Sequence, residues 1–91
     1  MRYAWNPDKA ESNFAKHGVP FAEAATVFLD PLATTYPDPE HSVGERRFVT
    51  IGYSATGRIL VISHVEGEGD LLRVISARTA TKRESHAYQE S

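Results

Sequence analysis

Four side chains that can bind or protonate an anionic group recur early in the chain: Lys9, Asn13, Lys16 and His17. An α-helix turns about 100° per residue, so the two lysines and Asn13 would fall within about 60° of one another, with His17 about 40° beyond Asn13. This spacing indicates one helix face that can handle a phosphate, with His17 as the acid–base group. The same pattern is also typical of a solvated face whose last turn favours positive charge.

Arginines dominate the cations of the second half. Residues 1–45 contain three Lys/Arg and seven Asp/Glu, a balance of −4, whereas residues 46–91 contain seven and five, a balance of +2. This asymmetry permits a local anion site, although scattered surface arginines would produce it as well. The arginines of this half are Arg46, Arg47, Arg58, Arg73, Arg78 and Arg83.

Arg73 and Arg78 belong to an apolar stretch that is typical of a strand. If the strand is regular, the two side chains point to opposite faces. An arginine among apolar neighbours needs a carboxylate or a bound phosphate as its partner. Glu84 is a candidate internal partner for either arginine, so one of them can belong to a structural ion pair. Arg46 precedes another strand and can lie at a sheet edge.

These residue types suit RNA cleavage through the 2′-hydroxyl. That reaction needs a base, an acid and fixed cations around the phosphorus, which histidine, lysine and arginine supply. Hydrolysis of DNA usually relies on metal ions held by clustered carboxylates, and no such cluster is visible. The sequence has no cysteine, no histidine pair at metal-binding helical spacing and no phosphate-binding or dinucleotide-binding loop. We therefore expect no metal and no other cofactor.

The elements that must position these residues follow from the hydrophobic period. A short strand is expected at residues 3–5, a helix from Pro7 to about His17 with Gly18 as its left-handed cap, and a second helix from Pro20 to Asp30. The period then changes to two. Strands are predicted over residues 32–36, 47–53, 58–65 and 71–77, and a capping box starts a last helix over residues 81–89. The order predicts an α+β fold with two N-terminal helices packed on an antiparallel sheet of about four to five strands, and a C-terminal helix.

Length and composition favour one domain over residues 1–91, with a single core. The apolar fraction of 41% and the charged fraction of 24% are ordinary for a globular protein, which excludes wholesale disorder. No apolar run is long enough to suggest a membrane span or a secretion signal. We expect a cytoplasmic protein.

A series of short motifs runs through nearly the whole chain in one order. They are Tyr3-Ala4-Trp5, Lys9, Asn13, Lys16-His17-Gly18-Val19, Phe21, Ala24, Phe28, Asp30-Pro31, Gly44-Glu45-Arg46, Gly52, His64, Arg73-Val74-Ile75-Ser76-Ala77-Arg78, Ala80, Glu84 and Tyr88. In this combination the sequence resembles the BrnT toxins of bacterial type II toxin–antitoxin systems. It departs from them at Asn6, where the family commonly has aspartate; asparagine can still cap a helix.

The resemblance implies a RelE-like ribonuclease fold and RNA cleavage that halts translation without a metal cofactor. It also implies a BrnA-type antitoxin with a ribbon-helix-helix part, so that DNA is contacted only through the toxin–antitoxin complex. With the residue pattern, it leads us to expect His17, Arg73 and Arg78 as catalytic residues. Lys9, Lys16 and Arg46 are the expected RNA-phosphate ligands.

Two other functions remain open from the sequence. The chain can be a non-catalytic module that docks a partner, since a basic antitoxin segment could lie on its acidic first half. A small DNA-binding regulator is disfavoured by the net charge of −2 and by the absence of a helix-turn-helix pattern.

Overall fold

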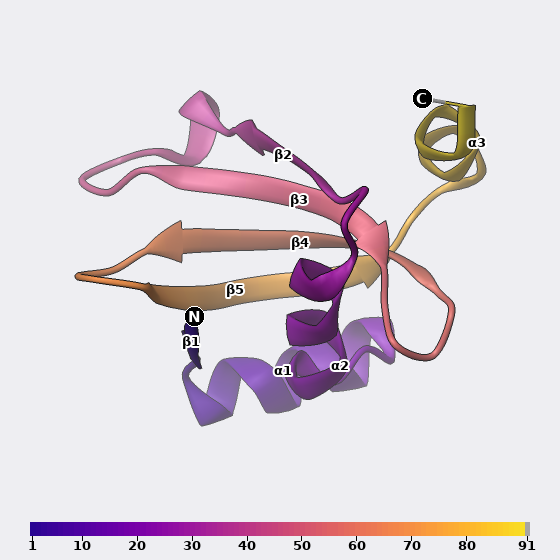
Figure 1. Cartoon of the computed structure of the whole chain (residues 1–91). Helices are drawn as coiled ribbons and strands as arrows, with labels where there is room; N and C mark the ends of the chain where they lie inside the picture. The colour runs from indigo at the N-terminus through magenta and orange to yellow at the C-terminus, as the bar shows by residue number, and fades with distance from the viewer. Residues whose placement is uncertain (91) are drawn as a thin grey trace.

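The structure is a computed structural model, and residues 1–90 are described; within them the chain forms three α-helices and one five-stranded sheet. The elements are β1 (Arg2–Ala4), α1 (Pro7–His17), α2 (Phe21–Thr26), η1 (Val27–Leu29), β2 (Thr34–Pro37), η2 (Pro39–His41), β3 (Arg47–Tyr53), β4 (Ile59–Glu66), β5 (Leu71–Thr79) and α3 (Lys82–Glu90), where η marks a 3-10 helix. α1 and α2 lie together on one side of the sheet, and α3 stands apart from them near the end of β5 (Figure 1). The α+β class and the expected order of elements are confirmed.

The strands are arranged in the order β1-β5-β4-β3-β2. All neighbouring pairs from β2 to β5 are antiparallel, as expected, but β1 runs parallel to β5. The sheet is therefore mixed at this one edge. β1 is held at the start of β5, where the Nε of Arg2 donates to Asp70 at 3.2 Å.

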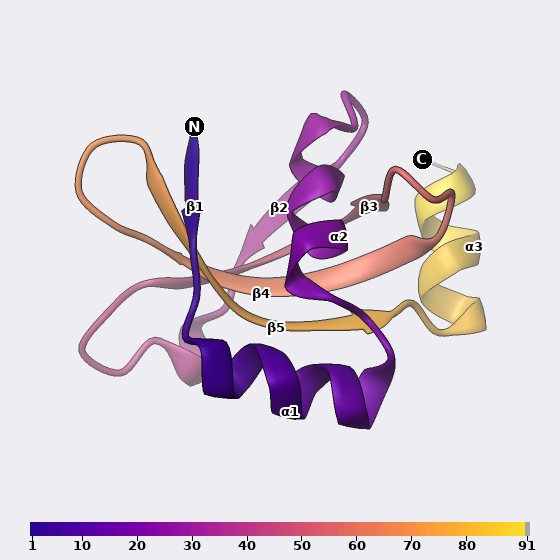
Figure 2. The same cartoon turned by 90° about the horizontal axis from the view of Figure 1, so that it is seen from below.

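The first helix begins and ends where its sequence predicts. The side chain of Asn6 accepts hydrogen bonds from the backbone N–H groups of Asp8 and Lys9, so asparagine does cap this helix. Gly18 has φ 69°, in the left-handed region that glycine adopts without a steric cost, and its N–H donates to the carbonyl of Phe14. These caps fix the length of α1, which runs alongside β5 (Figure 2).

One face of the sheet, here called the closed face, is covered by α1, α2 and η1. Its core holds the buried side chains Val19, Phe21, Ala24, Val27, Leu60, Ile62, Leu72, Val74 and Ala77. The stripe predicted for the second helix is confirmed by the burial of Phe21 and Ala24, although the last turn of that helix is the 3-10 segment η1. Among residues 1–90, no helix has the length and apolar character needed to cross a bilayer.

The opposite face, here called the open face, is covered only at one end, by α3. A smaller cluster of Ile51, Val61 and Tyr88 packs there. The hydroxyl of Tyr88 donates to the carboxylate of Asp30, which also accepts from the backbone N–H groups of Leu32 and Tyr53. Burial acts to raise the pKa of Asp30, but these hydrogen bonds outweigh it and lower the pKa below its usual value. The ionised Asp30 thus ties α3 to the end of α2 and to β3.

Candidate functional site

The open face carries three arginines from two strands. Arg47 of β3 is paired in register with Val65 of β4, which is paired in turn with Arg73 of β5. Directly paired residues project from the same face, so the two arginines flank Val65, which is buried. Arg78, paired with Val61, lies farther along β5 on the same face. The open face is therefore cationic along β5.

The expectation that Arg73 and Arg78 point to opposite faces is wrong. The β4–β5 register shifts between Ser63 and His64, which pair with Ser76 and Val74, so Ile75 is an extra residue in β5. An extra residue in one strand reverses the alternation beyond it. Val74 and Ala77, an odd number of residues apart, both lie in the closed-face core as a result.

Arg78 is held by Glu84. Its two terminal nitrogens donate to the two carboxylate oxygens at 2.7 and 2.9 Å. Glu84 also accepts from the N–H of Thr81 while its own N–H donates to the Thr81 hydroxyl, which confirms the predicted capping box. The guanidinium of Arg78 and these capping bonds lower the pKa of Glu84 to about 2 against the opposing effect of burial. Glu84 is therefore ionised at neutral pH and serves as an anchor rather than as a proton donor.

Arg73 has a weaker partner. One of its terminal nitrogens donates to Glu45 at 2.7 Å, and the two side chains are 46% and 45% exposed. An exposed pair of this kind contributes about 0–1 kcal/mol, so an anion can replace the carboxylate at small cost. Both arginines thus have carboxylate partners, where the sequence suggested a partner for one of them.

Asn13 does not belong to a solvated phosphate-binding face. It is buried, and its amide donates to the carbonyls of Ala77 and Val19 while its oxygen accepts from the N–H of Ala77. Both backbone groups of Ala77 are thereby satisfied by one side chain, as a neighbouring strand would satisfy them. Asn13 joins α1 to the part of β5 that β1 does not reach.

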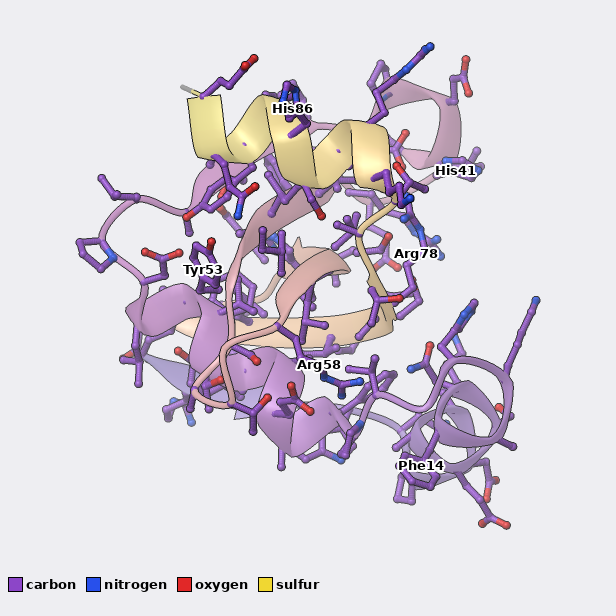
Figure 3. All side chains as sticks on the ribbon, turned by 90° about the vertical axis from the view of Figure 1, so that its right-hand side faces the viewer. Phe14, His41, Tyr53, Arg58, Arg78 and His86 are labelled. Atoms are coloured by element: carbon purple, nitrogen blue, oxygen red, sulfur yellow. The ribbon has the colours of Figure 1, made fainter. Side chains whose placement is uncertain are left out.

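This joint determines where the lysines lie. Phe14 projects from α1 on the side away from Arg78 (Figure 3). Helical geometry places Lys9 about 140° and Lys16 about 160° round the helix from Phe14, on the side toward Arg78. Both lysines are exposed. Lys9, Lys16 and Arg78, here called the lysine–arginine cluster, therefore flank the second half of β5.

His17 lies on the other side of Asn13. It is about 20° round the helix from Ala10, which packs against the closed-face core, and it is half-buried. The next residue, Gly18, accepts a hydrogen bond through its carbonyl from Arg58. The structure therefore brings Lys9, Lys16 and Arg78 together and places His17 at the boundary of this cluster, one residue beyond Lys16.

Arg46 is not brought to the open face with the other arginines. Its guanidinium lies 5.4 Å from the centre of the Phe48 ring, and Phe48 is stacked on His64 on the closed face. The neighbouring Arg47 takes the open-face position instead. The alternation of Val49, Ile51 and Tyr53 in the sequence could have identified Arg47, because it continues the same odd-numbered face.

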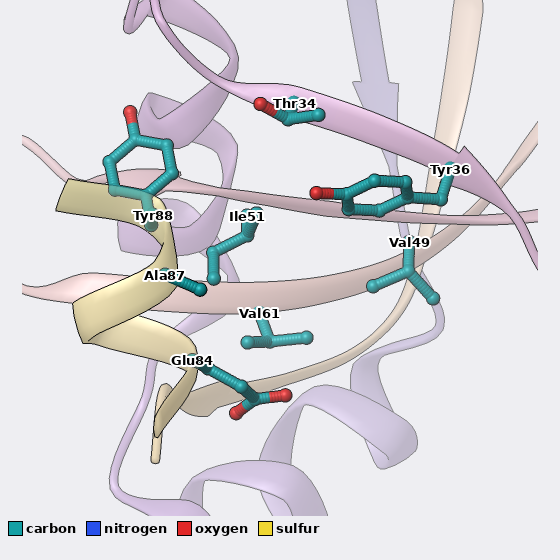
Figure 4. A pocket seen from close by; sticks show the side chains of 8 residues that line it. All are labelled: Thr34, Tyr36, Val49, Ile51, Val61, Glu84, Ala87 and Tyr88. Atoms are coloured by element: carbon teal, nitrogen blue, oxygen red, sulfur yellow. The ribbon is translucent and has the colours of Figure 1, made fainter. Parts of the chain in front are cut away.

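The open face also contains an apolar groove beside α3. Its volume is about 340 Å³, and it is lined by Thr34, Tyr36, Val49, Ile51, Val61, Glu84, Ala87 and Tyr88. Strand side chains form its floor, with Tyr36 on one side and the side chains of α3 on the other (Figure 4). Tyr36 is 53% exposed, so its ring is available to stack with a flat apolar group such as a nucleobase.

The other conspicuous histidine, His64, lies outside this site. Its ring is 3% exposed between Phe28 and Phe48, and burial lowers its pKa to about 4. The imidazole is neutral at pH 7, with its Nε2 hydrogen-bonded to Thr50. Within residues 1–90, no group of three His, Asp or Glu side chains is placed to hold a metal ion. The chemistry that the open face offers is phosphate binding and charge stabilisation by lysine and arginine.

Comparison with known proteins gives one family and one solved structure. Residues 5–84 match the family described as ribonuclease toxin, BrnT, of type II toxin–antitoxin system. The crystal structure of the ribonuclease toxin BrnT from Brucella abortus is similar, with a TM-score of 0.71 and 26% sequence identity, over 90% of this chain and 99% of that one. No curated protein matches.

Proposed function

Since the chain belongs to the BrnT family of ribonuclease toxins of type II toxin–antitoxin systems, we propose that it cleaves RNA on the open face, without a metal ion, and thereby halts translation. The observation that carries this proposal is the lysine–arginine cluster, in which cations from α1 and β5 flank one stretch of strand. Two elements that are rigidly joined through Asn13 hold these cations before substrate arrives. Such preorganised charge stabilises a transition state more than flexible charge does.

In the proposed reaction, a base removes the proton of the 2′-hydroxyl and the resulting oxyanion attacks the adjacent phosphorus. The bond to the 5′-oxygen breaks, and that oxygen receives a proton as it leaves. Lys9, Lys16 and Arg78 bind the phosphoryl oxygens as negative charge accumulates on them. His17, next to Lys16 in sequence, is proposed for one of the two proton transfers.

The experiment incubates the purified protein with RNA in excess EDTA. We expect cleavage products ending in a 2′,3′-cyclic phosphate. His17→Ala should lower the rate about 100-fold or more, and Lys16→Ala, at an exposed position, about 100-fold without loss of fold. Lys82→Ala, which removes an exposed lysine of α3, is the matched control. RNA that remains intact, or cleavage that neither substitution diminishes, would refute the mechanism.

We further propose a BrnA-type antitoxin with a ribbon-helix-helix part as the partner, with DNA bound only by the complex. Family membership supports an antitoxin, and the exposed acidic residues of the first half offer complementary charge to a basic segment. Expression of the chain alone in bacteria should arrest growth, and co-expression of the antitoxin should restore it. Harmless expression of folded protein would instead favour the non-catalytic docking module.

A further inference from the structure

We propose that Arg47 and Arg73 form a second phosphate subsite, which Glu45 fills in the free protein and which an RNA phosphate fills in the complex. The inference rests on the proposed function, since it names where a second part of the same RNA is bound. It adds Arg47 to the residues that contact substrate and gives Arg73 a role separate from that of Arg78.

The two arginines are arranged for a shared ligand. They are separated by one strand, about 10 Å between backbones, and both side chains rise from the same face on either side of buried Val65. An arginine side chain is long enough to cover an apolar floor with its stem and keep its guanidinium in solvent. Two guanidinium groups can thus approach one ligand from opposite sides.

The present partner of Arg73 indicates the ligand's chemistry. A carboxylate and a phosphate both present paired oxygens to the planar fork of a guanidinium. Glu45 supplies such oxygens, but it is about half exposed and only one nitrogen of Arg73 donates to it. A phosphodiester can accept hydrogen bonds from both arginines and displace Glu45.

Arg47 has unused capacity for such a bond. Its Nε is buried and has no hydrogen-bond partner within residues 1–90. An unsatisfied charged donor costs on the order of 1–3 kcal/mol, and a ligand that reorders this side chain can recover part of it. Arg58 offers a contrast, because its Nε and a terminal nitrogen both donate to Glu23.

The subsite lies at a distance from the lysine–arginine cluster. Five residues of β5 separate Arg73 from Arg78, about 16 Å at about 3.3 Å per residue. A stacked strand has one phosphate per about 3.4 Å, so about five nucleotides span this distance, and fewer do so if the strand is extended. One phosphate cannot contact both arginines, and a dinucleotide cannot reach both sites.

The first test measures binding of a ten-nucleotide RNA carrying 2′-O-methyl groups, which cannot be cleaved, over a series of salt concentrations. Each lost phosphate contact on a single strand lowers the slope of log K against log salt by about 0.7. Arg47→Ala and Arg73→Ala should each lower it by about 0.7 and weaken binding about 10-fold or more. Because the two arginines share one phosphate, the double variant should lower the slope by no more than either single one.

Glu45→Gln removes the competing carboxylate and should strengthen binding several-fold. Arg2→Ala, an exposed arginine of β1 paired with Asp70, is the matched control and should leave the slope unchanged. Unchanged slopes for both Arg47→Ala and Arg73→Ala would overturn the subsite. Additive slopes would overturn the sharing of one phosphate.

The second test compares cleavage of a ten-nucleotide RNA and a dinucleotide. Arg47→Ala should lower kcat/KM on the long RNA at least five times more than on the dinucleotide, because only the long RNA reaches Arg47. Equal losses on both would contradict the separation of the sites. If the wild-type protein cleaves neither RNA, the proposed function fails; if it cleaves both and the slopes are unchanged, only the subsite fails.

Discussion

The two faces of this sheet use the same kinds of residue for different purposes. On the closed face, Phe21, Leu60 and Ile62 are almost fully buried, and Arg58 is fixed by Glu23. On the open face, Arg73 has a half-exposed partner and Arg47 keeps an unsatisfied Nε. The difference teaches that a cation's role depends on how completely its partners satisfy it.

Glu23 and Glu45 illustrate the two cases. Glu23 is 11% exposed and accepts from Arg58, Ser54 and Thr56, so it ties α2 to the β3–β4 turn. Glu45 accepts from Arg73 alone and is exposed at a turn. Replacing residues of the closed face should therefore reduce stability, whereas replacing cations of the open face should reduce RNA binding with little loss of stability.

The largest difference should appear in the apolar residues of the two faces. Phe21→Ala should cost about 3–5 kcal/mol of unfolding free energy, because it leaves a cavity under α2. Val49→Ala, at a half-buried position lining the groove, should cost about 1 kcal/mol or less. Urea denaturation measures both. Similar losses would contradict the assignment of the closed face as the main core.

Asn13→Ala should follow, with a loss of about 2–3 kcal/mol, because it leaves the backbone groups of Ala77 and the carbonyl of Val19 without their partner. It should also weaken RNA binding, since the lysines are positioned through this joint. Asn13→Asp supplies no amide donor and should be nearly as harmful. If Asn13→Ala unfolds like the wild type, the side chain is not what holds α1 to β5.

Glu23→Gln should produce a loss that depends on pH. Hydrogen bonding from Arg58, and further bonds from Thr56 and Ser54, lower the pKa of Glu23 to about 2 from its usual 4.5, against the effect of burial. A lowered folded-state pKa gives stability that is present above about pH 4.5 and is lost as the pH falls toward 2. We expect Glu23→Gln to cost on the order of 1–2 kcal/mol at pH 7 and nothing near pH 2. A loss that is constant with pH would exclude the ion pair as its cause.

Local signals in the sequence predict the closed face well. The caps at Asn6 and Gly18, the apolar stripe of α2 and the Thr81–Glu84 capping box depend on residues close in sequence, and all are confirmed. The parallel direction of β1 was not predicted, because a three-residue strand carries no signal for its direction. The family resemblance, which depends on many motifs together, is confirmed by the match over residues 5–84.

The arrangement of the site was harder to predict because it depends on contacts distant in sequence. The extra residue at Ile75 reverses the alternation of β5 and moves Arg78 onto the face of Arg73, and no composition of the strand indicates this shift. Asn13 appeared to share a solvated face with the lysines, since its partner Ala77 is 64 residues away. The catalytic role of His17 remains a proposal.

The smallest effect should distinguish Arg46 from Arg47, adjacent residues on opposite faces. The sequence predicted Arg46 as a phosphate ligand, whereas its guanidinium lies over the Phe48 ring, a contact of about 0.5–1 kcal/mol at an exposed site. Arg46→Ala should therefore cost about that much stability and change the salt dependence of RNA binding far less than Arg47→Ala. Each substitution removes one positive charge, so net charge cannot explain a difference between them. A lower slope for Arg46→Ala and an unchanged slope for Arg47→Ala would show that RNA follows the edge of the sheet rather than its open face.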